Sequence, residues 1–226
     1  MRPFIADFAT RRAHVRRYLK IVVRAEREGR AGPIRPADAQ RLNVLRAGTF
    51  LILYNLVEAS ARAIVEAIHD EIVSSKTEFA DLRDSLRKEV VRGFKRSGDA
   101  DLHYTMVHLP TEFVWASLDV ERMFSGNVDA RLIRNIAEVY GFDAETPRSR
   151  TYGGSDLLTI KNLRNDLAHG VKTFDDVGRE YPAQQLVGIT SRSVAYMEAI
   201  LKNVSDFLDH AGYRVFLPPM SPMPPT

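Results

Sequence analysis

The chain has 226 residues, of which 45% are hydrophobic and 27% are charged. This composition is typical of a water-soluble globular protein and argues against a disordered, collagen-like or membrane protein. The absence of cysteine excludes disulfides, thiolate zinc sites, iron–sulfur clusters and a cysteine nucleophile. The net charge is +3, but residues 1–46 hold 12 Lys and Arg against 4 Asp and Glu. The basic charge is therefore concentrated near the N-terminus.

No export signal or membrane segment is predicted. Arginines occupy positions 11, 12, 16 and 17, where a signal peptide would need its apolar stretch. The most apolar segment, residues 47–68, is interrupted by Asn55, Glu58 and Arg62. We expect a cytoplasmic protein with no membrane partner.

The apolar pattern is helical along most of the chain. Apolar residues recur at spacings of three and four, which predicts an all-α fold. The first helix is expected over about residues 7–28 and should stop at Gly29. Asp38 is predicted to cap a long central helix that runs to Ile72.

A more charged helix is predicted after the central one. Ser75 and Thr77 can cap it, and it should cover about residues 78–96. Residues 97–110 are predicted to form an irregular connection, followed by a short helix that begins near Pro110.

Two further helices are marked by glycines at their ends. One should cover about residues 129–140 and stop at Gly141. Ser155 is predicted to cap the other, and Gly170 stands where a left-handed residue ends a helix.

The last long helix is predicted over about residues 183–210, directly after Pro182. From residue 218 onward, five of the nine residues are proline, so the helix cannot continue there. We predict a single helical domain over residues 1–213 and a proline-rich tail over residues 214–226.

The helix predicted after Ser155 carries most of the groups suited to chemistry. Its apolar stripe consists of Leu157, Ile160, Leu163 and Leu167, and Arg164 falls on the edge of that stripe. A buried arginine needs a partner, and Glu58, within the apolar central helix, is one hypothesis. The alternative is that Glu58 pairs locally with Arg62, four residues further on.

The polar residues of this helix do not all share one face. Asn165 and His169 are four residues apart and can act on one ligand or hydrogen-bond to each other. Arg164 and His169 are separated by roughly 140° around an ideal helix. Both can reach one substrate over the helix end, or a symmetric dimer can bring two Arg/His sets into one cleft.

The segment from Arg164 to His169 matches the R-x4-H signature of HEPN domains, with Asn after the Arg and Ala-His-Gly at the end. Further stretches resemble, in the same order, the blocks of the MAE-like HEPN nuclease family. They are DFATRRAHVRRYL, TFLILYNLVEASARAI, FSGNVDARLIRNIAEVYGF and LRNDLAHGVKTFDDVGREY. The resemblance covers about residues 4 to 213.

This resemblance implies a HEPN-like bundle of long antiparallel helices with short additional helices, which dimerises around the motif helix. It implies an endoribonuclease that needs no metal or other cofactor and serves as a toxin or defence effector. Arg164 would stabilise the pentacoordinate phosphorane, His169 would move protons, and Asn165 would position the phosphate. Attack by the RNA 2′-OH would leave a 2′,3′-cyclic phosphate.

The implied partners are RNA, a second copy of the chain and an antitoxin or other neighbouring-gene product. HEPN toxins that are silenced by adenylylation carry a tyrosine two residues after the histidine, and here Val171 takes that position. This departure puts that mode of control in doubt.

Several alternatives stay open at this point. Asp166 is either a solvated or capping residue or a supporting member of the site. Arg11, Arg12, Arg16 and Arg17 form either a solvated face or a surface for the RNA backbone. The whole domain is either the nuclease or a catalytically silent HEPN module that binds RNA, nucleotide or a protein partner.

Overall fold

The computed structural model describes residues 1–29, 35–97, 123–124 and 126–215. Its elements are α1 (Pro3–Gly29), α2 (Pro36–Ser74), η1 (Phe79–Asp81), α3 (Asp84–Ser97), α6 (Ala130–Tyr140), α7 (Arg148–Thr151), η3 (Tyr152–Gly154), α8 (Ser155–Ala168), α9 (Phe174–Glu180) and α10 (Ala183–Asp209). These residues contain no β-strand, so the predicted all-α fold is confirmed. None of the described helices combines the length and the apolarity of a transmembrane span.

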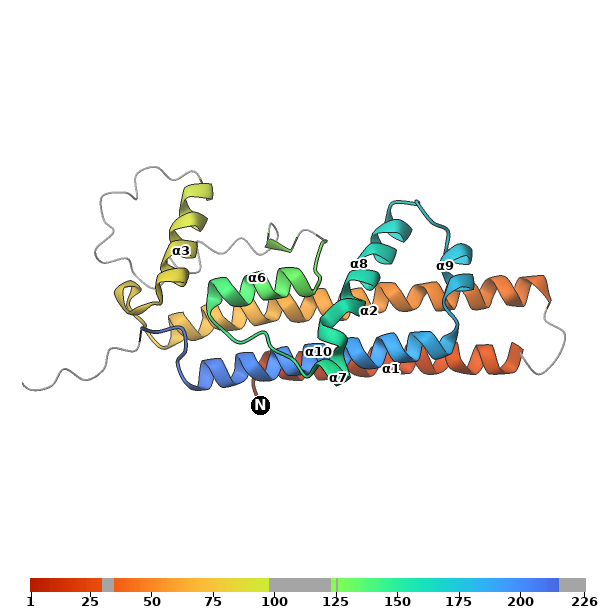
Figure 1. Ribbon diagram of the computed structural model, residues 1–226, viewed down its shortest axis with the longest axis horizontal. Helices are drawn as coiled ribbons and strands as arrows, with labels where there is room; N and C mark the ends of the chain where they lie inside the picture. Colours follow the sequence, from red (N-terminus) through yellow and green to blue (C-terminus); the bar gives the residue numbers. More distant parts are fainter. Residues whose placement is uncertain (30–34, 98–122, 125, 216–226) are drawn as a thin grey trace, which may run out of the picture.

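Three long helices form the body of the molecule, as the sequence predicts. α1, α2 and α10 lie along its long axis, and α1 runs antiparallel to the other two (Figure 1). Two ion pairs of Arg2 agree with these directions, because they join the start of α1 to the ends of the other two helices. Arg2 pairs with Glu71 near the end of α2 at 2.8 Å and with Asp209 at the end of α10 at 2.6 Å.

A buried carboxylate joins the opposite ends of the same helices. Glu26, near the end of α1, accepts a hydrogen bond from Arg46 of α2 at 2.7 Å. It also accepts the backbone N–H of Ala183, the first residue of α10, at 2.7 Å. Glu26 is only 6% exposed, so the attraction acts where water screens it little.

The core follows α2, whose apolar residues are buried around much of its circumference. α1 and α10 pack on one side of α2, whereas α6, α8 and α9 approach it from the other (Figure 1). A buried hydrogen bond of 2.9 Å joins His69 of α2 to the Tyr140 hydroxyl of α6. Burial on most of its sides explains why α2 is apolar over its middle, including residues such as Phe50, Leu53, Leu56, Val57, Ile64, Val65 and Ile68.

The predicted cap of the central helix is wrong. α2 begins at Pro36, not after Asp38, and its N-cap residue is Arg35. Proline suits the first turn of a helix because the N–H that it lacks would have no partner there. Asp38 instead pairs with Arg35 at 3.0 Å.

The predicted caps of the third helix are also wrong. Ser75 is the C-cap residue of α2, and Thr77 is buried, where it accepts hydrogen bonds from Arg214. The chain makes the η1 turn first, and α3 starts only at Asp84. The short helix predicted near Pro110, and most of the connection before it, lie outside the described residues.

The first residues of the predicted tail lie against the domain. Arg214 forms an isolated β-bridge with Leu82, and the N–H of Val215 bonds to the Asp81 carbonyl at 2.8 Å. The boundary at residue 213 stays a prediction, and residues 216–226 are outside the described part of the chain.

Candidate active site

A tight left-handed turn sets the start of α8. Gly154, the N-cap residue, has φ of +78°, and a Cβ there would come within 2.7 Å of Tyr196 and Ala130. Glycine is therefore required at this position, because other residues disfavour this φ and because a Cβ would clash with its neighbours. Ser155 is the first helical residue rather than the predicted cap. The predicted apolar stripe is buried, namely Leu157, Ile160, Leu163 and Leu167.

The other end of α8 is closed by a Schellman motif. The Val171 N–H bonds to the Asp166 carbonyl at 2.8 Å, and the Gly170 N–H lies 3.4 Å from the Leu167 carbonyl. Gly170 has φ of +69°, which confirms the left-handed residue predicted there. His169 is the C-cap residue, and it is exposed.

Arg164 is held against the central helix by an aromatic ring. Its guanidinium carbon lies 4.7 Å from the centroid of the Tyr54 ring, within the range of a cation–π contact. Its Nη1 donates a hydrogen bond to Asn165 Oδ1 at 2.9 Å. Gly126 passes so close that a Cβ there would lie 3.3 Å from Arg164 Nη1. The guanidinium is thus fixed in direction before any ligand arrives.

Arg164 borders an open pocket of about 270 Å³ at the surface of α2. Glu58 lies in this pocket, but its ion-pair partner is Arg62 at 3.0 Å. Among the described residues no ion pair joins Glu58 to Arg164, so the hypothesis of that pair is wrong and the local alternative is confirmed. The full lining is Leu51, Tyr54, Asn55, Glu58, Ala59, Arg62 and Arg164.

This pocket has a net positive charge. Arg62 and Arg164 supply two cations and Glu58 one anion. Arg62 is also tied to the backbone, because it donates a hydrogen bond to the Phe124 carbonyl at 2.9 Å. The excess charge and the planar donors of Arg164 suit an anionic ligand such as a phosphate.

Tyr54 is a site residue that the sequence did not reveal, because an aromatic residue in an apolar helix fits the core equally well. Tyr54 is 3% exposed, and its hydroxyl accepts the Val128 N–H at 3.2 Å. Burial raises the pKa of Tyr54, Glu58 raises it further, and the bond from Val128 and the charge of Arg164 oppose the rise. The sequence offered one indication of this role: Tyr54 is four residues from Glu58, the hypothesised partner of Arg164, and lies on the same face of α2.

The side chain of Asn165 connects α8 to the loop before α6. Its Nδ2 donates to Asn127 Oδ1 at 3.3 Å, while its Oδ1 accepts from Arg164. Asn165 and His169 were predicted either to hydrogen-bond to each other or to act on one ligand. No hydrogen bond joins these two described residues, and the shared ligand stays a prediction. Asn127 is a second residue that sequence reasoning missed, since a turn asparagine carries no distinctive pattern.

His169 and Asp166 lie beyond the pocket, toward the end of α8. No described residue forms a hydrogen bond or ion pair with the His169 imidazole or the Asp166 carboxylate. Arg164 faces α2, and no contact joins it to His169 within the described residues of one chain. The role of Asp166 stays a prediction.

The four N-terminal arginines differ in their surroundings. Arg11 pairs with Asp7 at 2.7 Å and donates to Asn55 at 3.1 Å, which places it beside the pocket of Arg164. Arg12 instead pairs with Glu198 on α10. Arg16 and Arg17 are exposed, one turn further along α1. The basic face of α1 therefore reaches the candidate site at Arg11.

The described residues contain no group of three or more His, Asp or Glu side chains that could hold a metal ion. An all-helical bundle with an arginine and a histidine five residues apart at the end of a short helix is the arrangement that the resemblance to HEPN domains implies. A family model for MAE-like HEPN proteins matches residues 4–213, so the chain belongs to that family. Comparisons with curated proteins and with solved structures gave no match.

Proposed function

We propose that the protein is a metal-independent endoribonuclease. The observation that carries the proposal is the placement of Arg164, stacked on Tyr54 at the edge of a positively charged pocket, on the same helix that ends in an exposed histidine. HEPN domains are commonly ribonucleases, so family membership supports the same conclusion.

The proposed reaction uses the RNA itself as the nucleophile. The 2′ oxygen attacks the adjacent phosphorus, the bond from phosphorus to the 5′ oxygen breaks, and the products carry a 2′,3′-cyclic phosphate and a 5′-OH. One imidazole takes the proton of the 2′-OH, and a protonated imidazole gives a proton to the leaving oxygen. Arg164 stabilises the negative charge of the phosphorane, and Asn165 positions the phosphate.

A dimer of the chain would supply both imidazoles and both guanidiniums. Arg164 and His169 do not meet within one chain, and they point about 140° apart on an ideal helix. A two-fold axis near residues 164–170 would bring two such sets into one cleft. Val171, directly beyond the motif, is 71% exposed, and a partner copy would cover this apolar side chain.

We expect the enzyme to act in the cytoplasm as a toxin or defence effector that a neighbouring-gene product restrains. A nuclease that cuts cellular RNA without a cofactor has to be held inactive until it is needed. Expression of the chain alone should arrest growth, and the restraining protein should relieve the arrest.

The proposal is tested with labelled tRNA, mRNA and rRNA in the presence of EDTA. Wild type should cut at least one of these RNAs, and Arg164→Ala and His169→Ala should each lose about 100-fold or more of the rate. His210→Ala is the matched control, because His210 is likewise an exposed helix C-cap residue, at the end of α10. Folded wild type that leaves all three RNAs intact would favour the silent binding module.

Mixing the two inactive variants tests the shared site. A mixed dimer of Arg164→Ala and His169→Ala chains keeps one intact arginine and one intact histidine in the common cleft. The one remaining imidazole then has to act first as base and then as acid, so we expect the mixture to regain only part of the cleavage activity, above the level of either variant alone. Mixed dimers that form but stay inactive would place each site within one chain.

A further inference from the structure

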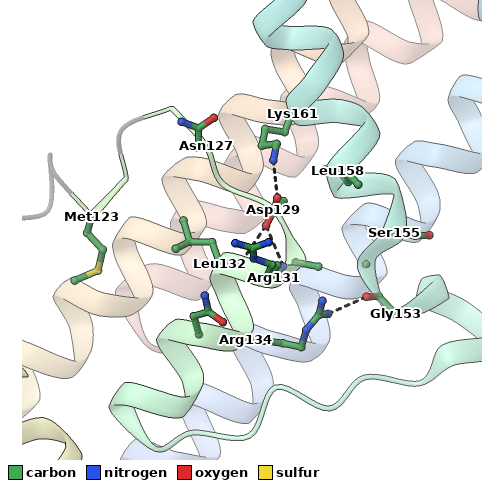
Figure 2. Close-up of a pocket in the computed structure, with 13 residues that line it drawn as sticks. Met123, Asn127, Asp129, Arg131, Leu132, Arg134, Gly153, Ser155, Leu158 and Lys161 are labelled. Carbon is green, nitrogen blue, oxygen red and sulfur yellow. Dashed lines mark hydrogen bonds and ion pairs between the residues drawn. The ribbon is translucent and has the colours of Figure 1, made fainter.

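A second and larger cavity lies on the other flank of the motif helix. It has a volume of about 640 Å³ and is formed between the first turns of α6 and the start of α8 (Figure 2). This size falls within the range of sites for small ligands and cofactors. Nothing in the reaction proposed above uses the cavity, although it shares the helix that carries Arg164.

The charges around this cavity leave it positive. Asp129, the acidic residue of the lining, accepts hydrogen bonds from Lys161 at 2.7 Å and from the Arg131 and Leu132 N–H groups at 3.0 Å each. Burial opposes its ionisation, but these bonds outweigh burial and hold the pKa of Asp129 below its ordinary value. The carboxylate is thus engaged by Lys161 and by the N-terminus of α6.

Two arginines in the lining have no carboxylate partner among the described residues. Arg131 and Arg134 are both exposed on α6, and Arg134 donates a hydrogen bond to the Gly153 carbonyl at 3.3 Å (Figure 2). With Lys161 and Asp129 cancelling each other, these arginines give the cavity a net charge of +2. Guanidinium groups in such a position bind phosphate oxygens well.

The remaining lining suits a nucleobase. Leu158 and Leu132 supply apolar surface, and Leu158 is 49% exposed although it is a large apolar residue. Asn135 contributes an amide, which can both donate to and accept from the edge of a base. We propose that this cavity binds one nucleotide unit, with the phosphate on Arg131 and Arg134 and the base against the leucines.

The cavity is connected to the candidate active site. Asn127 lines it and accepts a hydrogen bond from Asn165, which in turn accepts one from Arg164. Lys161 precedes Arg164 by three residues, about one helical turn. The nucleotide unit is therefore the one next to the scissile phosphate in bound RNA, an inference that rests on the proposed function. A free nucleotide carries the same phosphate and base, so it is the other ligand that could occupy the cavity.

The test measures equilibrium binding of a fluorescently labelled single-stranded RNA in EDTA, with every protein carrying His169→Ala so that the RNA stays intact. Arg131→Gln/Arg134→Gln should bind about tenfold more weakly, and because the two arginines hold one phosphate, the slope of log K against log salt should fall by about 0.7. Leu158→Trp fills the space for the base, so it should weaken binding without changing that slope. Arg150→Gln, an exposed arginine outside both cavities, is the matched control and should change neither.

Competition with UMP, CMP, AMP and GMP separates the two sources. Loss of RNA affinity in the cavity variants supports bound RNA. Nucleotide binding that these variants abolish, with RNA affinity unchanged, supports a free nucleotide instead. The proposal is overturned if the cavity variants alter neither.

Cleavage measured in the same variants without His169→Ala distinguishes this inference from the proposed function. Wild type that cuts no RNA but binds it through the cavity would remove the nuclease and leave the nucleotide site. Wild type that cuts RNA, while the cavity variants bind RNA with normal affinity, would support the nuclease and remove the nucleotide site.

Discussion

Replacing Tyr54 by leucine removes the ring whose centroid lies 4.7 Å from the Arg164 guanidinium carbon. The hydrogen bond from Arg164 to Asn165 stays in place. A cation–π contact stabilises by about 0.5–2 kcal/mol, depending on its exposure to water. If the contact serves to aim Arg164 at the phosphorane, Tyr54→Leu should slow RNA cleavage by about 2- to 30-fold. In an Arg164→Ala background the same replacement should slow cleavage no further.

Tyr54→Phe separates the role of the ring from that of the hydroxyl. Phenylalanine keeps the aromatic face, so cleavage should stay within about twofold of wild type. It removes the acceptor of the buried Val128 N–H, so the free energy of unfolding should fall by about 1–3 kcal/mol. Single-turnover cleavage and urea unfolding measure the two effects separately. Equal rates for the leucine and phenylalanine variants would refute the positioning role of the ring.

Three further predictions concern stability. Glu26→Gln leaves the Arg46 guanidinium, whose side chain is only 14% exposed, without its counter-ion, so urea unfolding should show a loss of about 3–5 kcal/mol, and an unchanged midpoint would count against the pair. Tyr140→Phe removes the hydroxyl that bonds His69 at 2.9 Å and should cost about 1–3 kcal/mol in the same assay, whereas no loss would show the bond to be dispensable. Folding lowers the pKa of Asp129, so the ionised carboxylate stabilises the folded protein fully above about pH 4, and this stabilisation is lost as the pH falls further. Asp129→Asn should remove that part of the pH dependence of the free energy of unfolding. Identical pH profiles for wild type and variant would contradict the assignment.

The parts of the fold that depend on local rules could be predicted from the sequence. The three- and four-residue apolar spacing gave the long helices, and glycine at positions 141 and 170 marked two helix ends because left-handed backbone favours it. α9 was not predicted, although Thr173 and Asp176 form a capping box that the sequence displays.

The arrangement of the site could be predicted only in part, because it depends on which sides of two helices meet. The sequence identifies Arg164 as a charge at the edge of an apolar stripe and correctly implies that it needs a partner. It cannot show that Tyr54 rather than Glu58 lies beneath the guanidinium, since both are on the same face of α2. Residues contributed by a loop, such as Asn127, carry no periodicity and appear only once the chain is folded.

The nuclease account is tested most directly by the chemistry of its product. Wild type is incubated in EDTA with an RNA that it cuts, and with the same RNA carrying a single 2′-deoxy nucleotide on the 5′ side of the cut bond. A 2′-OH nucleophile should give a 2′,3′-cyclic phosphate and a 5′-OH from the first RNA and no cleavage at that bond in the second. Cleavage that persists at the deoxy position, or that His169→Ala leaves unchanged, would contradict it.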